Sequence, residues 1–255
     1  MSERDETQAF LDSLPELKHG EQFCFQCHPS IECFNACCAD LNLSLTPYDA
    51  LRLRRALGED SETFLTTRTD ISTYPDTGYP RVHLRMRDDT ARRPCPFVTE
   101  EGCSVYLDRP AACRTYPVGR ATRVVRGGVG ERFFVVREDH CQGFTEPKEW
   151  TPETWMADQG LEPYNVMNDR TMKLMAQQKS QGLAITAKQA TMLLLALYQP
   201  DKFQKFVGEM GVFEHVEGEF DPQTVLADEE TALGFGHDWA ALILYGDHDR
   251  LQRKK

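Results

Sequence analysis

The sequence predicts an α+β fold, in which a cysteine-rich part with short helices and a β-hairpin is followed by a helical C-terminal region. Three observations lead to this prediction. All nine cysteines lie within residues 24–141, and residues 142–255 contain none. Alternating polarity and a glycine-rich turn between apolar runs indicate β-structure in the first part. Successive helix-start signals fill the second part.

The change in cysteine content also indicates how the chain is organised. It indicates an approximate domain boundary near Trp150, where prolines and threonines interrupt the sequence. We therefore expect a cysteine-cluster domain over residues 1–150 and a helical region over residues 151–255. The 255 residues are enough for one large domain or two modest ones.

Two helices are expected in the first part. Thr46 and Pro47 form a good helix start, because threonine caps and proline at the first helical position has no amide proton to leave unsatisfied. This helix should end at Gly58, and a second short helix should begin at Ser61.

Two patterns in the first part predict β-structure. Apolar and polar side chains alternate along residues 80–87, with Val82, Leu84 and Met86 on one side, as in a half-buried strand. Residues 122–125 and 133–136 flank a glycine-rich segment and predict a β-hairpin.

The second part is expected to be helical throughout. Thr151-Pro152 and a Thr186-Ala-Lys-Gln capping box are helix starts, and Pro200 should follow a helix end. One predicted helix starts at Thr151. Four more are predicted over residues 162–180, 186–198, 201–210 and 236–245.

Composition excludes several classes of partner. The net charge of -11 argues against sequence-independent nucleic-acid binding and against an anionic membrane surface. The basic side chains of Arg85, Arg87, Arg92 and Arg93 are interpreted as a solvated charged face. No apolar run approaches the roughly 20 residues that span a bilayer.

We expect a cytoplasmic protein. Residues 1–10 are acidic and polar, unlike a secretory signal. In a reducing compartment a disulfide framework is not expected, which leaves metal ligands, redox thiols or a catalytic nucleophile.

The cysteines form two groups, residues 24–38 and residues 95–141. Thiolates are soft donors that suit zinc and iron–sulfur centres. The pair Cys24 and Cys27 has chelating spacing, although such a pair alone also fits a redox site. A Cys–His nucleophile would leave the other cysteines unexplained, and inert burial is a poor account of nine clustered thiols.

The surroundings of the second group favour a metal site. Cys95 lies between two prolines, Cys103 follows a glycine, and Cys113 comes three residues after Pro110. Such turns hold thiolates on rigid backbone and free amides to donate to sulfur. His28 and His140 lie beside cysteines, and we interpret them as supporting residues rather than ligands.

Separate blocks of the sequence carry a family resemblance. Residues 23–145 resemble the YkgJ-type cysteine-cluster family, whose members are described as zinc- or iron-chelating proteins with eight characteristic cysteines. The first cluster is more widely spaced here than in the family. The matching blocks are Cys27-His28-Pro29 with Cys33, Cys37 and Cys38, Leu45-Thr46-Pro47-Tyr48-Asp49, Cys95-Pro96-Phe97, Gly102-Cys103-Ser104-Val105-Tyr106, Arg109-Pro110, Cys113-Arg114-Thr115-Tyr116-Pro117, and Cys141.

The resemblance implies a ligand set in which Cys24 is the extra cysteine. A distant similarity to flagellin lysine methylases hints at an iron–sulfur cluster rather than zinc, without implying methylase activity. The eight implied metal ligands are Cys27, Cys33, Cys37, Cys38, Cys95, Cys103, Cys113 and Cys141. If so, the two groups of cysteines should converge in space.

Two functions stay open at this point. In one, the cysteines hold zinc, iron or an iron–sulfur cluster, and the function lies in binding a protein partner or in buffering metal. In the other, the centre belongs to an enzyme of redox or group-transfer chemistry. Arg109 and Arg114 either bind the cofactor by offsetting the negative charge of the polythiolate site, or bind an anionic substrate, or pair with carboxylates. A methionine-rich stripe in the C-terminal helices is interpreted as core rather than a partner groove.

Overall fold

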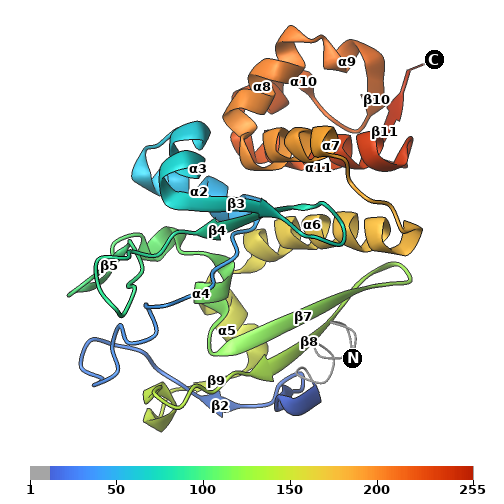
Figure 1. The fold of residues 1–255 in the computed structure, drawn as a ribbon. Helices are drawn as coiled ribbons and strands as arrows, with labels where there is room; N and C mark the ends of the chain where they lie inside the picture. Colours follow the sequence, from blue (N-terminus) through green and yellow to red (C-terminus); the bar gives the residue numbers. More distant parts are fainter. Residues whose placement is uncertain (1–11, 255) are drawn as a thin grey trace. The chain divides into compact units, whose positions relative to one another are not determined.

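The computed structural model describes residues 12–254, so the segment judged not to be a secretory signal lies outside the described residues. The fold is α+β, as predicted (Figure 1). The chain divides into two compact units, which we describe separately, and the compositional division near Trp150 stays a prediction. Unit 1 comprises Met1–Leu41, Met86–Tyr106 and Ala111–Pro163, and unit 2 comprises Asn42–Arg85, Leu107–Pro110 and Tyr164–Lys255.

The largest sheet of unit 1 contains the predicted hairpin. Strand β7 (Val118–Val125) pairs antiparallel with β8 (Gly128–Val135) across a turn in which Gly127 has φ +87°, a conformation that favours glycine. The other edge of β8 pairs with β1 (Glu16–Leu17). The hairpin is longer than the sequence pattern indicated.

Short elements complete unit 1. Strand β2 (Phe23–Cys24) pairs with β9 (Glu149–Trp150), and β5 (Val98–Thr99) pairs with β6 (Gly102–Cys103). The remaining elements are the 3-10 turns η1 (Tyr106–Asp108) and η2 (Gly143–Thr145) and the helices α4 (Ala111–Thr115) and α5 (Pro152–Asp158), which Thr151 caps as predicted.

An aromatic cluster forms the core of unit 1. Phe25 is 3% exposed and packs edge-to-face against Tyr116, Phe144 and Trp155. The Trp155 indole donates a hydrogen bond of 2.8 Å to the Thr115 carbonyl, so its polar end is satisfied. This core is small, and the cysteine-bearing loops extend from it.

Unit 2 begins with the two predicted helices and a strand pair. Helix α2 (Pro47–Leu57) has the predicted Thr46 cap and ends at Gly58, and α3 (Ser61–Arg68) follows. Strand β4 (Pro80–Leu84) has the expected alternating burial and pairs with β3 (Thr69–Thr73), which the sequence did not predict.

The rest of unit 2 is mostly helical. Helix α7 has the predicted Thr186 capping box and continues into a π-helical turn, η3. The last long helix begins at Glu229 rather than residue 236, because Asp228 caps it by accepting from the Thr231 amide. These elements are α6 (Glu162–Gln181), α7 (Ala187–Leu193), η3 (Leu194–Tyr198), α8 (Pro200–Glu209), α9 (Val212–His215), β10 (Val216–Gly218), α10 (Pro222–Ala227), α11 (Glu229–Tyr245) and β11 (Leu251–Arg253), which pairs with β10.

The core of unit 2 is large and apolar. Phe203 is fully buried and packs against Phe206, Phe235 and Trp239 at ring-centroid distances of 5.3–6.2 Å. Helix α11 approaches η3 closely at Gly236, where a Cβ atom would lie 2.3 Å from the carbonyl oxygen of Ala196. No helix within residues 12–254 is long and apolar enough to cross a membrane.

Candidate metal centre

The first group of cysteines lies on a succession of tight turns in unit 1. Backbone hydrogen bonds of 2.9–3.1 Å run from Phe34 to Ile31, from Ala36 to Cys33 and from Cys38 to Asn35. Asn35 has φ +64°, which reverses the chain just before Cys37 and Cys38. The loop therefore presents its thiols from separate turns instead of from one regular element.

Cys95 lies at the start of a turn that directs backbone amides toward its sulfur. The Val98 N–H donates a hydrogen bond of 3.2 Å to the Cys95 carbonyl. The backbone N–H groups of Phe97 and Val98 lower the pKa of the Cys95 thiol, but burial is the larger effect and raises this pKa above its ordinary value. Cys103 is on β6, directly opposite Val98 of β5. Cys95 and Cys103 interact electrostatically, so this hairpin brings two thiols together.

The two cysteine groups meet at Cys38. The Cys95 amide donates a hydrogen bond of 2.9 Å to the Cys38 carbonyl, and a β-bridge joins Ala39 to Pro94. The Cys38 thiol interacts electrostatically with the thiols of Cys95 and Cys113. The two groups are therefore in backbone contact at Cys38 and Cys95, and the convergence of their sulfur atoms on one centre stays a prediction.

The loop that carries Cys141 joins the same region. The backbone amide of Gln142 donates a hydrogen bond of 3.2 Å to the Cys33 sulfur. Cys37 interacts electrostatically with His140 and Glu138, which directly precede Cys141. The last cysteine is thus close to the first group, although 103 residues separate Cys38 from Cys141 in the sequence.

The neighbouring thiols of Cys37 and Cys38 share a proton. The Cys38 S–H donates to the Cys37 sulfur, which lowers the pKa of Cys37 to about 6. The same hydrogen bond, followed by burial, raises the pKa of Cys38 well above its ordinary value. The pair therefore loses its first proton near neutral pH, which provides one thiolate for a soft metal ion.

A tyrosine hydroxyl lies beside the Cys141 sulfur. The Tyr116 Oη atom is buried and has no hydrogen-bond partner among the described residues. Burial raises the pKa of Tyr116, and the nearby Cys141 thiol raises it further. A buried donor without an acceptor is costly, and a thiolate at Cys141 would satisfy it.

Cys24 and Cys27 lie at the edge of this region. Cys24 is exposed on strand β2, paired with Glu149 of β9. Cys27 is exposed as well, and the adjacent His28 lies 3.4 Å from a Glu146 carboxylate oxygen. His140 similarly lies 3.4 Å from Glu138.

The two predicted anion-binding arginines have different locations. Arg114 is buried in α4, and its Nη1 atom donates a hydrogen bond of 2.6 Å to the Gln159 carbonyl just after helix α5. Arg109 lies in the Leu107–Pro110 segment of unit 2. Their proposed role toward an anion stays a prediction.

The donor chemistry of this region fits zinc or iron. All nine cysteines are free thiols, one is acidic, and both an amide and a buried hydroxyl face individual sulfurs. Such donors are typical partners of metal-bound thiolates. Within residues 12–254, no three His, Cys, Asp or Glu side chains already stand in an arrangement that could hold a metal ion.

Residues 26–142 match the model of the CxxCxxCC family, described as "Putative zinc- or iron-chelating domain". Over this segment the chain is similar to that family. The family is the one that the cysteine blocks resembled, and the match supports metal binding in general. No curated protein and no solved structure matches the chain. The matched segment contains eight of the nine cysteines, since Cys24 precedes it.

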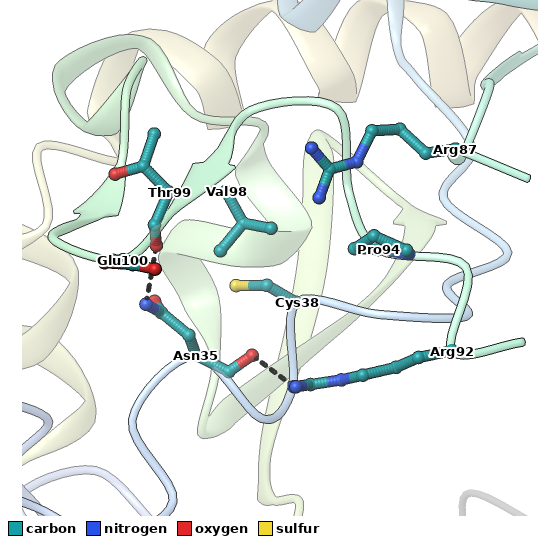
Figure 2. A pocket seen from close by; sticks show the side chains of 8 residues that line it. All are labelled: Asn35, Cys38, Arg87, Arg92, Pro94, Val98, Thr99 and Glu100. Atoms are coloured by element: carbon teal, nitrogen blue, oxygen red, sulfur yellow. Dashed lines mark hydrogen bonds between the residues drawn. The ribbon is translucent and has the colours of Figure 1, made fainter. Parts of the chain in front are cut away.

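Sequence reasoning missed one feature of this region, an open pocket beside Cys38. Arg87 and Arg92 were interpreted as part of a solvated charged face, and their side chains are exposed. Arg85 and Arg93 pair with Asp70 and Asp40. Arg87 and Arg92 line the pocket beside Cys38 (Figure 2). No periodicity or spacing could have separated these two pairs of arginines.

Proposed function

We propose that the segment matched by the family model, residues 26–142, holds zinc, iron or an iron–sulfur cluster through its cysteine thiolates. The observation that carries the proposal is the meeting of separate chain segments at Cys38, whose thiol interacts with those of Cys95 and Cys113. Thiols from distant segments gain little from proximity unless something binds them together. The proposed ligands are Cys27, Cys33, Cys37, Cys38, Cys95, Cys103, Cys113 and Cys141.

Eight thiolates exceed the needs of one tetrahedral site. They suit two closed sites, or one four-cysteine cluster with additional structural thiols. In either case metal binding would be coupled to local folding of the cysteine loops, since no described group of side chains already stands in a metal-holding arrangement. When bound, zinc supplies a rigid crosslink, and an iron–sulfur cluster adds electron transfer.

The domain's own residues would orient and stabilise the thiolates. The backbone amide of Gln142 donates to the Cys33 sulfur, and the amides of Phe97 and Val98 favour the thiolate form of Cys95. The Tyr116 hydroxyl faces Cys141. Each donor stabilises the ionised sulfur, which is the form that binds metal.

A second candidate function is an iron or iron–sulfur enzyme with an unknown substrate. One observation favours it, a cavity of about 470 Å³ that reaches the Cys38 side chain. A structural metal site satisfies all its positions with protein ligands, whereas a catalytic site keeps one position open to a small molecule. A cavity beside a proposed ligand suits the second arrangement.

Anaerobic purification followed by metal and acid-labile sulfide analysis tests the proposal. We expect stoichiometric zinc or iron, with sulfide if a cluster is present. Cys38→Ser, Cys95→Ser and Cys113→Ser should each lose much of the metal, because a hydroxyl is a poor ligand for a soft ion. Full metal content in all three variants, or none in the unmodified protein, would contradict the proposal.

A further inference from the structure

A cavity of about 470 Å³ lies within unit 1, next to the meeting point of the cysteine groups. Its wall includes the Cys38 side chain and the apolar side chains of Pro94 and Val98. Figure 2 shows Cys38 between the side chains of Arg87 and Arg92. Both arginine side chains are exposed, so their guanidinium groups line an open surface pocket that is large enough for a small molecule.

Arg92 is held in place by the first cysteine loop. Its Nη2 atom donates hydrogen bonds of 2.9 Å to the Asn35 carbonyl and 3.2 Å to the Ala36 carbonyl (Figure 2). These bonds use one of its three nitrogens and leave the positive charge without a carboxylate partner among residues 12–254. The remaining donors of this guanidinium are available to a ligand.

Arg87 is the second cation of the cavity. Its backbone amide donates a hydrogen bond of 2.9 Å to the Pro94 carbonyl, which fixes where the side chain begins. No carboxylate among residues 12–254 pairs with its guanidinium, although Arg52, Arg55 and Arg68 of unit 2 all have such partners. Its charge is close enough to Cys95 to lower the pKa of that thiol.

The chemistry of the wall limits what the cavity can bind. A guanidinium is always charged and donates in a planar fork that matches the oxygens of a carboxylate or phosphate. The lining contains one carboxylate, Glu100, which disfavours a highly charged polyanion. The net charge of -11 for the chain acts in the same direction. A small ligand with one oxyanionic group satisfies both conditions.

We propose that this cavity binds a small-molecule oxyanion, carried by a carboxylate or a phosphate group, through Arg87 and Arg92. This inference goes beyond metal binding and does not require it. If the thiolates hold a metal as proposed above, the bound oxyanion lies beside that centre, because Cys38 is common to both.

Equilibrium dialysis with labelled inorganic phosphate in one arm and labelled acetate in the other tests the inference. Ionic strength is matched with chloride, and the protein is used as purified. Saturable binding of at least one probe is expected, and the better probe distinguishes a phosphate from a carboxylate ligand. Arg87→Ala should weaken binding by about ten-fold or more, the loss expected for a charge-assisted hydrogen bond.

Arg93→Ala is the matched control. It removes the same charge from the same segment, but Arg93 pairs with Asp40 and does not line the cavity. Its binding should stay within about two-fold of the unmodified protein. Arg87→Lys keeps the charge without the fork, so it should bind more weakly than the unmodified protein and more tightly than Arg87→Ala.

Two results would overturn the inference. One is the absence of saturable binding of either probe to the correctly folded protein, and the other is equal weakening by Arg93→Ala and Arg87→Ala. Metal content is measured on the same samples. Loss of metal in Arg87→Ala, without oxyanion binding in the unmodified protein, would assign Arg87 to the thiolates instead. Oxyanion binding by a protein without metal would contradict only the proposed metal function.

Discussion

The two units of this chain are stabilised in different ways. Unit 2 buries a continuous apolar cluster that includes Phe203, Phe235 and Trp239. Unit 1 has a smaller aromatic cluster around Phe25, and its cysteine loops are turns and two-residue strands. A large core stabilises its surroundings by hydrophobic burial, whereas small domains with limited cores often depend on metals or other crosslinks. If unit 1 holds a metal as proposed, the comparison predicts that its stability depends on that metal and that the stability of unit 2 does not.

Metal removal should have the largest effect and should be confined to unit 1. Chelation under reducing conditions is expected to abolish amide-exchange protection in the cysteine-rich segment 24–41, since structural metal binding contributes on the order of 10 kcal/mol to folding. Protection in α11 should persist. Hydrogen exchange with mass spectrometry measures both regions at once. Unchanged protection of residues 24–41 after verified metal loss would show that the two units do not differ in their dependence on metal.

Truncation of the apolar core should produce the opposite pattern. Phe203→Ala is expected to lower the free energy of unfolding by about 3–5 kcal/mol, the cost of a large cavity, without changing metal content. Met210→Ala is a suitable control, because Met210 is 63% exposed, and its effect should be within about 0.5 kcal/mol. Chemical denaturation and metal analysis of both variants check the prediction.

Acid should destabilise unit 2 through a buried histidine. His237 bonds to Thr171 and to the Leu233 carbonyl, and burial lowers its pKa from 6.5 to about 4, with Arg170 adding to the shift and Asp238 opposing it. The unfolded chain binds this proton below pH 6.5 and the folded chain does not, so this contribution is complete above pH 6.5. It should be lost progressively between pH 6.5 and 4, by about 3 kcal/mol in total.

His237→Gln is the control for this pH dependence. The variant has no titrating side chain at position 237. The difference between the pH-dependent changes in unfolding free energy of the two proteins is therefore the contribution of His237. Denaturation curves at several pH values give this difference. Identical pH profiles for the two proteins would show that the histidine does not contribute.

How far the sequence predicted this structure depended on how local each signal was. The caps at Thr46, Thr151 and Thr186 lie within a few residues of the amides they bond, so the local sequence was sufficient to predict these helix starts. Strand β3 was missed because only Thr69 is buried along it, which leaves no alternation. The start of α11 was missed because interior glycines resemble helix breakers, although Gly236 is needed for close packing against η3.

In the candidate site, too, the features with a local sequence signal were predicted and the tertiary features were not. Cysteine content and turn residues were sufficient to predict a metal site. The cavity depends on the backbone bond between Arg87 and Pro94 and on the path of the first cysteine loop beside Arg92. Both are tertiary features that follow from where the chain returns in space. An arginine at a cavity and an arginine in solvent therefore have the same local sequence signal.

A smaller effect is expected at Tyr116. Tyr116→Phe removes the hydroxyl beside Cys141 and leaves the aromatic packing against Phe25 intact. Residues that support metal ligands typically contribute about 10–100-fold to metal affinity, and we expect the lower end of that range here. Competition with a chromogenic chelator measures it. Unaltered affinity would mean that the hydroxyl serves only the fold.

The smallest effect is expected at Cys24. It is exposed on β2 and precedes the matched family segment, so Cys24→Ser should keep its full metal content. Cys27→Ser and Cys113→Ser are the matched comparisons and should lose much of theirs. Equal loss in Cys24→Ser and Cys113→Ser would show that the proposed set of eight ligands is wrong.

X-ray absorption at the metal edge tests the central claim most directly. If cysteine thiolates hold the metal, the anaerobically purified protein should show a first shell dominated by sulfur, at about 2.3 Å for zinc. A first shell made only of nitrogen and oxygen, at about 2.0–2.2 Å, would contradict thiolate coordination in this domain.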